Sequence, residues 1–189
     1  MTPHALDPAY RRTTVREFLD MDIGDAKAEL VDGMILMMAG GSPRHAAIAA
    51  NLIIALGPRL RGTGCRPYGS DLAMQTGEAS IRFPDVSVYC SDAPPPDDPK
   101  VKLLGDPKVV FEVLSPSTAS NDQITKLREY RALAGVEAVV FVDPSSERVR
   151  LVDRSMADDT EGGWLPAGTD LALPMLDITI PHAEIFTRD

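Results

Sequence analysis

A run of apolar residues interrupted by a single carboxylate constrains this chain more than any other feature. Residues 108–114 read Lys-Val-Val-Phe-Glu-Val-Leu, and Glu112 is the only charged residue after the initial lysine. Such a run is typical of a central strand that is covered on both faces. An ionised carboxylate there costs several kcal/mol unless a partner compensates its charge. We therefore expect Glu112 to have either a structural salt bridge or a metal ion, whose charge would make its burial favourable.

Capping and turn signals predict the elements around this strand. Thr14 with Glu17 forms a capping box, Ser42-Pro43 begins a long helix, and Asp32-Gly33 is a two-residue hairpin turn. In chain order, we expect a helix at 14–21, a hairpin of 28–31 with 34–38, a helix at 43–61, strands at 65–75, 80–89 and 108–114, a helix at 120–134, strands at 136–142 and 148–153, and short apolar pieces at 171–173 and 178–180. This order predicts one α/β domain over residues 1–189, a mixed central sheet flanked by helices with an N-terminal hairpin.

The two cysteines are predicted to lie opposite each other. A hairpin centred on Gly77-Glu78 pairs positions whose numbers sum to about 155, which places Cys65 opposite Cys90. Two cysteines are too few for a disulfide scaffold, and no apolar run approaches the roughly 20 residues needed to cross a bilayer. The N-terminus also lacks the apolar core of a signal peptide. We therefore expect a cytoplasmic protein with no membrane association, in which both thiols are reduced.

The charge distribution bears on a nucleic-acid partner. The net charge of −9 argues against a protein that coats nucleic acid through bulk electrostatics. The acidity lies in the two ends, however, because residues 44–131 hold eleven Lys/Arg against ten Asp/Glu. The central part of the chain is therefore nearly neutral, which leaves a nucleic-acid substrate open.

Asp85 is the second candidate site residue. It follows Pro84, which removes a backbone donor and indicates a strand edge or an irregular entry into the strand. Strands lie about 4.8 Å apart, so carboxylates on neighbouring strands can share one hard cation. Asp85 is thus either a metal ligand with Glu112 or an ordinary aspartate at the end of a strand.

The helix after Glu112 carries a third group of candidates. Asp122, Lys126 and Tyr130 are spaced i, i+4 and i+8, so they share one face of that helix. Two interpretations of Lys126 remain open. It forms a solvated ion pair with Asp122, or it reaches back to the carboxylates.

These segments carry a resemblance to a known family. Pro84-Asp85 followed after a long loop by Glu112-Val113-Leu114 resembles the PD-(D/E)XK arrangement of restriction-endonuclease-like nucleases. More specifically, residues 13–144 resemble the bacterial Uma-two endonuclease family. Four segments carry this resemblance: 29–33 (Glu-Leu-Val-Asp-Gly), 82–85 (Arg-Phe-Pro-Asp), 112–118 (Glu-Val-Leu-Ser-Pro-Ser-Thr) and 122–136, from Asp122 to Gly135-Val136. The elements expected from the sequence give a helix-strand-strand-strand-helix-strand core, and the resemblance makes it restriction-endonuclease-like.

The resemblance also implies a site. Asp85, Glu112 and the Val113 carbonyl would bind Mg²⁺ or Mn²⁺. Leu114 stands where the superfamily pattern has a catalytic lysine, and Lys126 is the candidate to replace it.

Two further residues match family positions. Glu29 either extends the metal site or caps the hairpin. His45 is either a catalytic residue or a neutral, hydrogen-bonded side chain in the first turn of its helix.

The expected function is metal-dependent hydrolysis of phosphodiester bonds, with DNA as substrate. One site cuts one strand, so a double-strand cut calls for a homodimer. The alternative is a non-catalytic module that keeps the nuclease fold to bind DNA or protein.

Overall fold

A computed structural model describes residues 12–24, 26–38, 40–94, 96–98, 100–115, 120–156 and 163–188, apart from the side chains of residues 120–122. Its helices are α1 (Val15–Leu19), α2 (Pro43–Leu60), α3 (Ser120–Ala132) and α4 (His182–Phe186), with a 3-10 turn at Pro174–Leu176. Its strands are β1 (Ala28–Val31), β2 (Met34–Met37), β3 (Cys65–Gly69), β4 (Met74–Gly77), β5 (Ser80–Arg82), β6 (Val86–Cys90), β7 (Val109–Val113), β8 (Ala138–Asp143), β9 (Arg148–Asp153), β10 (Leu171–Leu173) and β11 (Ile178–Ile180).

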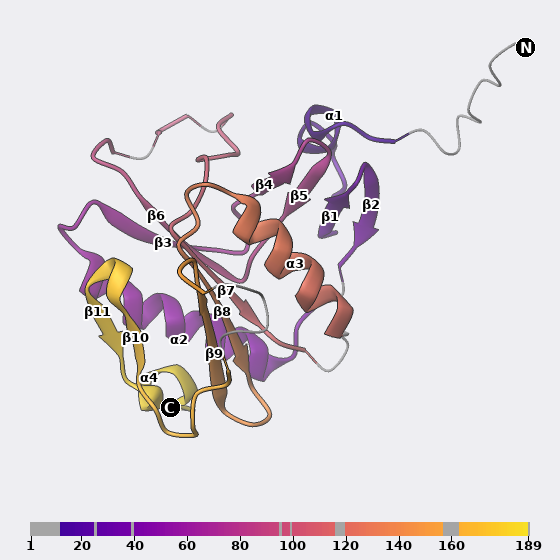
Figure 1. Ribbon diagram of the computed structural model, residues 1–189. Coiled ribbons are helices and arrows are strands. Elements are labelled where there is room, and N and C mark those ends of the chain that lie inside the picture. Colours follow the sequence, from indigo (N-terminus) through magenta and orange to yellow (C-terminus); the bar gives the residue numbers. More distant parts are fainter. Residues whose placement is uncertain are drawn as a thin grey trace, which may run out of the picture.

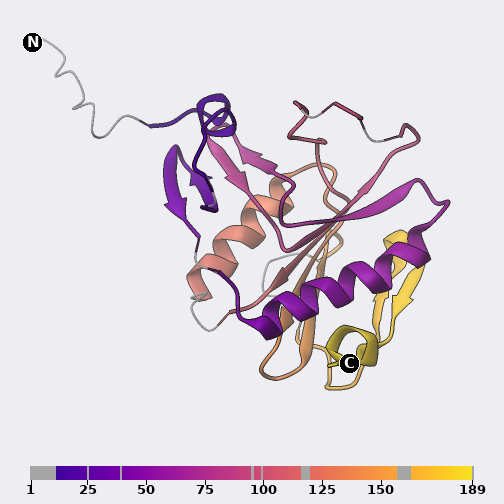
Figure 2. The same ribbon diagram turned by 180° about the vertical axis from the view of Figure 1, so that it is seen from behind.

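The central sheet has five strands in the order β3-β6-β7-β8-β9. The pairing of β7 with β8 is parallel and the other pairings are antiparallel, so the predicted mixed sheet is confirmed. Helix α2 covers one face and α3 the other, as the two opposite views show (Figures 1 and 2). Strand β7 lies in the middle of this sandwich, and all five of its residues are buried. This position explains the apolar run around Glu112.

The signals at the N-terminal ends of the helices behave as predicted. Thr14 accepts a hydrogen bond from the Glu17 backbone, and the Glu17 side chain accepts one from the Thr14 backbone, which completes the capping box. Ser42 accepts a hydrogen bond from the His45 backbone at the start of α2. The hairpin turn at Asp32-Gly33 has positive φ at both residues, as this turn type requires.

The hairpin predicted over residues 65–89 is wrong in one respect. Its open end forms β3 and β6 of the central sheet, but its closed end, β4 and β5, joins β1 and β2 in a second sheet of order β2-β1-β5-β4. A register shift between β4 and β5 accompanies this change. The hairpin divides because Ile81 and Ala73 pack with Phe18 and Leu30 in a separate apolar cluster beneath α1.

The cysteines correct a second expectation. Cys65 and Cys90 are directly paired across β3 and β6, as predicted, but the structure joins them in a disulfide rather than leaving two thiols. Their Cα atoms are 3.9 Å apart, which brings the two sulfur atoms within bonding reach. The expectation of two reduced thiols came from the assumed cytoplasmic setting and not from the predicted pairing of the two residues. Among the described residues, no helix is long and apolar enough to cross a membrane.

Candidate functional site

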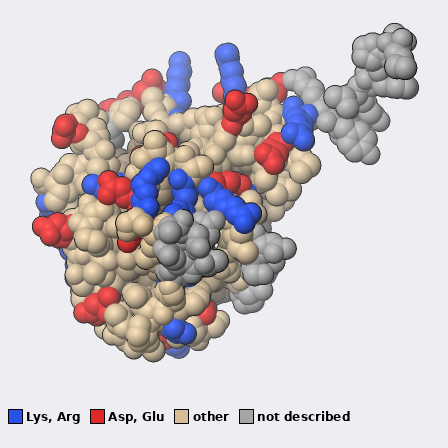
Figure 3. Space-filling model, in the orientation of Figure 1, with Lys and Arg blue, Asp and Glu red and all other residues tan. Residues whose placement is uncertain are grey.

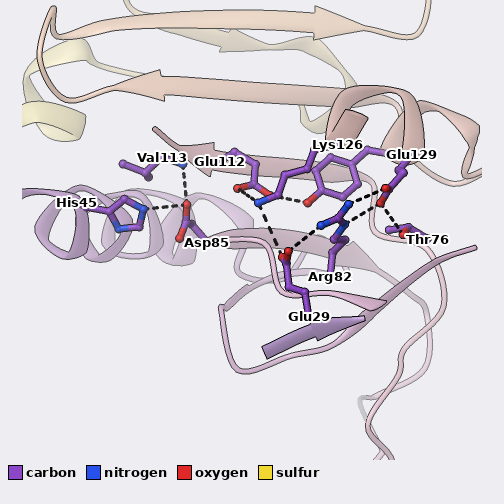
Figure 4. Close-up of polar contacts among 10 residues, drawn as sticks. Glu29, His45, Thr76, Arg82, Asp85, Glu112, Val113, Lys126 and Glu129 are labelled. Carbon is purple, nitrogen blue, oxygen red and sulfur yellow. Dashed lines mark hydrogen bonds and ion pairs between the residues drawn. The ribbon is translucent and has the colours of Figure 1, made fainter. Parts of the chain in front are cut away.

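The register of the central sheet brings Asp85 and Glu112 together. Val86 pairs with Phe111 at the end of the antiparallel ladder of β6 and β7. Asp85 lies just before β6, and its carboxylate accepts a hydrogen bond from the backbone N–H of Val113, the residue that follows Glu112 in β7. Figure 4 shows the two side chains next to each other, between His45 and Lys126. Both carboxylates therefore lie at the end of β7, where the chain leaves the sheet.

Glu112 has two partners on α3. Lys126 Nζ lies 3.2 Å from Glu112 Oε2, and the Tyr130 hydroxyl donates a hydrogen bond of 2.5 Å to Glu112 Oε1. Burial raises the pKa of Glu112 to about 7, and the charge of Asp85 adds to this shift while Lys126 opposes it. Glu112 is therefore a buried acid whose negative charge depends on nearby cations.

The structure places Lys126 in the core rather than on a solvated face. Its side chain is 11% exposed, and its ammonium lies between Glu112 Oε2 at 3.2 Å and Glu29 Oε1 at 3.8 Å. The Asp122 side chain lies outside the described residues, so its predicted ion pair has no description here. Leu114, at the position of the expected lysine, packs with the apolar cluster under α3. The ammonium thus reaches the carboxylates from the helix instead of from the strand.

Asp85 is bound from two sides. Its Oδ2 accepts a hydrogen bond of 2.7 Å from the Val113 backbone N–H, and His45 Nε2 lies 3.3 Å from the same oxygen. The hydrogen bond to Asp85 raises the pKa of His45, although burial lowers it, and the Val113 backbone adds to the rise. His45 therefore contacts the groups that the sequence assigns to the metal, and its positive form is favoured there.

Glu29 belongs to a buried charge network that sequence reasoning recognised only in part. Arg82 Nη1 donates to Glu29 Oε2 at 2.8 Å, and the other side of the Arg82 guanidinium donates to both oxygens of Glu129. The Arg82 side chain is 3% exposed. Arg82 and Glu129 were not predicted as site residues. Arg82 stands in the quoted Arg-Phe-Pro-Asp segment, and Glu129 follows Lys126 by three residues, so both signals were available.

This donor set fits a divalent cation. Three carboxylates, those of Glu29, Glu112 and Glu129, pair with the basic groups of Arg82 and Lys126, and Asp85 lies beside Glu112 (Figure 4). Among the described residues, Glu29 Oε1 is buried without a hydrogen-bond partner. No three His, Cys, Asp or Glu side chains in the described ranges are grouped as metal ligands. A set of Asp85, Glu112 and the Val113 carbonyl completed by water suits magnesium, which usually keeps several waters.

Basic side chains gather on the surface over α3. Figure 3 shows Lys and Arg side chains grouped in the middle of the face that α3 occupies. Arg128 is exposed on α3, and Arg154 donates to the carbonyls of Leu133, Ala134 and Val136, which follow the C-terminal end of this helix. The acidic chain thus presents a local basic surface on the helix that carries Lys126.

Comparisons with known proteins show the family and the fold of this chain. Residues 15–180 match the family model Uma2, described as "Putative restriction endonuclease". Two uncharacterized proteins of Synechocystis sp. are similar in sequence. One is 31% identical over 167 residues, covering 87% of this chain and 84% of its own, and the other is 27% identical over 124 residues, covering 65% and 70%. The crystal structure of a putative nuclease belonging to DUF820 from Anabaena variabilis shares the fold, with a TM-score of 0.76, 18% identity and coverage of 92% and 97%.

Proposed function

Because this chain belongs to the Uma2 family of putative restriction endonucleases, we propose that it hydrolyses phosphodiester bonds of DNA with Mg²⁺ or Mn²⁺. One observation carries the proposal. Two carboxylates, Asp85 just before β6 and Glu112 in β7, lie next to each other (Figure 4), with the Lys126 ammonium 3.2 Å from Glu112. The basic surface over α3 (Figure 3) supports an anionic substrate.

The side chains of the site would have separate roles in the reaction. Asp85, Glu112 and the Val113 carbonyl would hold the ion, which when bound polarises the scissile phosphate and lowers the pKa of its water. The Lys126 ammonium would stabilise negative charge that develops on the phosphate. Arg82 holds Glu29 through a 2.8 Å hydrogen bond, which keeps a carboxylate oxygen of Glu29 facing Lys126.

His45 and Tyr130 would act on the two carboxylates. His45 orients Asp85 from the first turn of α2, and Tyr130 fixes one oxygen of Glu112 from α3. These contacts limit the rotation of both carboxylates, so the oxygens that face the ion are pre-organised. A double-strand cut needs two such sites, and the proposal therefore includes a homodimer.

The alternative is a module that binds DNA or protein without cutting. It is favoured by one observation, that Lys126 and Tyr130 already satisfy both oxygens of Glu112. In a site of this kind the buried negative charge of Glu112 would be compensated without a metal ion.

A nuclease assay separates the two functions. Purified protein is incubated with plasmid DNA in Mg²⁺, in Mn²⁺ and in EDTA, beside Asp85→Asn and the matched control Asp71→Asn. Asp71 is 94% exposed and pairs with Lys27 on the surface, so its amide variant should cut like the native protein. We expect metal-dependent cleavage that Asp85→Asn abolishes. DNA binding without cleavage in either metal would favour the binding module, and equal loss in both variants would remove Asp85 from the site.

A further inference from the structure

Strand β2 is apolar, and none of the residues that the structure describes pairs with its outer edge. Met34, Leu36 and Met37 are 59%, 47% and 65% exposed, and they are three of the four residues of the strand. In the described residues, β2 pairs with β1 alone and forms the outer strand of its sheet (Figure 1). Natural edge strands usually carry charges, prolines or bulges that prevent pairing with another chain. The sequence of β2 has none of these devices.

The backbone of β2 offers a defined set of hydrogen-bonding groups to this open side. Met38 N–H donates to Lys27 O, and β1 and β2 pair in a register whose residue numbers sum to 65. Hydrogen-bonded and non-hydrogen-bonded pairs alternate along such a ladder. Leu36 therefore bonds to β1, whereas the N–H and C=O groups of Ile35 and Met37 point away from it. Those four groups are available to another strand.

The charge distribution selects a second copy of this chain as the partner. Residues 33–41 contain no charged residue, although the chain as a whole carries −9. A two-fold contact brings each residue close to its own copy or to a near neighbour, so like charges would repel there. At β2 two copies can meet without that repulsion.

We propose that β2 pairs with β2 of a second copy in an antiparallel ladder, which joins the two four-stranded sheets. The outward groups fix the register. Ile35 of each copy exchanges two hydrogen bonds with Met37 of the other, and Leu36 meets its own copy on the two-fold axis. The four hydrogen bonds and the covered side chains of Met34, Leu36 and Met37 stabilise the contact. A four-residue strand alone covers less than the about 800 Å² per partner of a tight complex, so we expect association at micromolar concentration.

This pairing gives the proposed nuclease a defined dimer, and the purpose of the dimer rests on that proposed function. The axis of such a ladder is perpendicular to the sheet, so both copies present the same face on the same side. Glu29 lies on the β1 residue opposite Leu36 and shares its face. Three strand spacings then separate the two β1 strands, or about 14 Å. The two candidate sites therefore open toward one side, as two cuts in one duplex would require.

Cross-linking at position 36 tests the contact. Opposite residues in a non-hydrogen-bonded pair have Cα atoms about 4.5 Å apart, within the range that a disulfide accepts. We expect Leu36→Cys to form a covalent dimer under mild oxidation, seen on a non-reducing gel, at concentrations where the native chain sediments as a dimer. Ile54→Cys is the matched control, because Ile54 is 69% exposed on α2, away from β2. Equal cross-linking of both variants would overturn the proposal.

A charge placed on the axis provides a second measurement. Leu36→Glu brings two carboxylates into direct opposition, and we expect it to raise the dimer dissociation constant at least tenfold in sedimentation equilibrium. Far-ultraviolet circular dichroism checks that the variant is folded. Weak complexes form at concentrations up to about 200 µM. A native chain that is still monomeric at that concentration would refute β2 pairing, and so would a Leu36→Glu variant that dimerises as well as the native chain. Both measurements use metal-free protein without DNA, so they are independent of whether the chain proves to be a nuclease.

Discussion

Replacing Lys126 with methionine is the sharpest test of how the site is built. Methionine keeps most of the apolar stem of the side chain and removes only the charge. The ammonium that is lost lies 3.2 Å from Glu112 and 3.8 Å from Glu29, on a side chain that is 11% exposed. The variant therefore leaves two buried carboxylates without this cation.

The expected cost follows from burial. Removing one partner of a buried ion pair usually destabilises a protein by about 3–5 kcal/mol, whereas an exposed pair contributes about 0–1 kcal/mol. Lys27→Met supplies the matched control, because Lys27 is 57% exposed and pairs at 2.9 Å with Asp71, which is 94% exposed. We expect a loss of about 3 kcal/mol for Lys126→Met and less than about 1 kcal/mol for Lys27→Met. For a chain of this size, about 3 kcal/mol lowers the melting temperature by roughly 6–12 °C.

The pH dependence gives the prediction its sign. The pKa of Glu112 is raised from 4.5 to about 7 in the folded protein, so the folded state binds its proton more tightly than the unfolded state. The stability that this tighter proton binding gives the folded state is fully present below pH 4.5 and is lost as the pH rises through 7. Because Lys126 lowers the pKa of Glu112, its removal moves the folded pKa higher still and extends the loss above pH 7. The destabilisation should therefore be small at pH 5 and largest near pH 9.

Urea unfolding followed by circular dichroism at pH 5, 7 and 9 measures this difference. The native protein, Lys126→Met and Lys27→Met are compared in EDTA, so that bound metal contributes nothing. A Lys126→Met loss that stays constant across this range, or one no larger than that of Lys27→Met, would refute the buried role of Lys126.

Three other variants test neighbouring contacts. Arg82→Met should cost about 3–5 kcal/mol in urea unfolding, because it leaves Glu29 and Glu129 without their shared guanidinium, and a cost below about 1 kcal/mol would contradict this. Tyr130→Phe should cost about 1–3 kcal/mol and move the pKa of Glu112 upward, since Tyr130 lowers it; an unchanged pH profile of stability would count against the contact. Mg²⁺ at a hundredfold excess over its dissociation constant should stabilise the native protein by about 3 kcal/mol but not Glu112→Gln; equal melting shifts in both would exclude Glu112 as a ligand.

The residues that could be identified from the sequence are those whose type does not fit their immediate neighbours in the chain. Glu112 inside an apolar run and Asp85 after Pro84 needed an explanation from their immediate neighbours alone. The helix spacing of Lys126 and Tyr130 likewise showed that they share a face. Arg82 and Glu129 were missed because each is ordinary in its local context, and a charged residue in a short strand or a helix is usually solvated. Their burial results from the second sheet meeting α3, where Thr76 and Arg82 both donate to Glu129, and local sequence does not encode this contact.

The sequence by itself determined the elements, the alternation that buries β7 and the pairing of Cys65 with Cys90, since these depend on neighbouring residues and on short-range register. The tertiary structure decided which elements meet. It divided one long hairpin between two sheets, brought Glu29 and Arg82 under α3, and turned Lys126 toward Glu112. These outcomes depend on packing between segments that are distant in the chain. Several faces could cover the same apolar surface, and the free energy of the whole fold decides which of them does. The open β2 edge arises in the same way, because the strand's exposure is set by which neighbours the second sheet acquires.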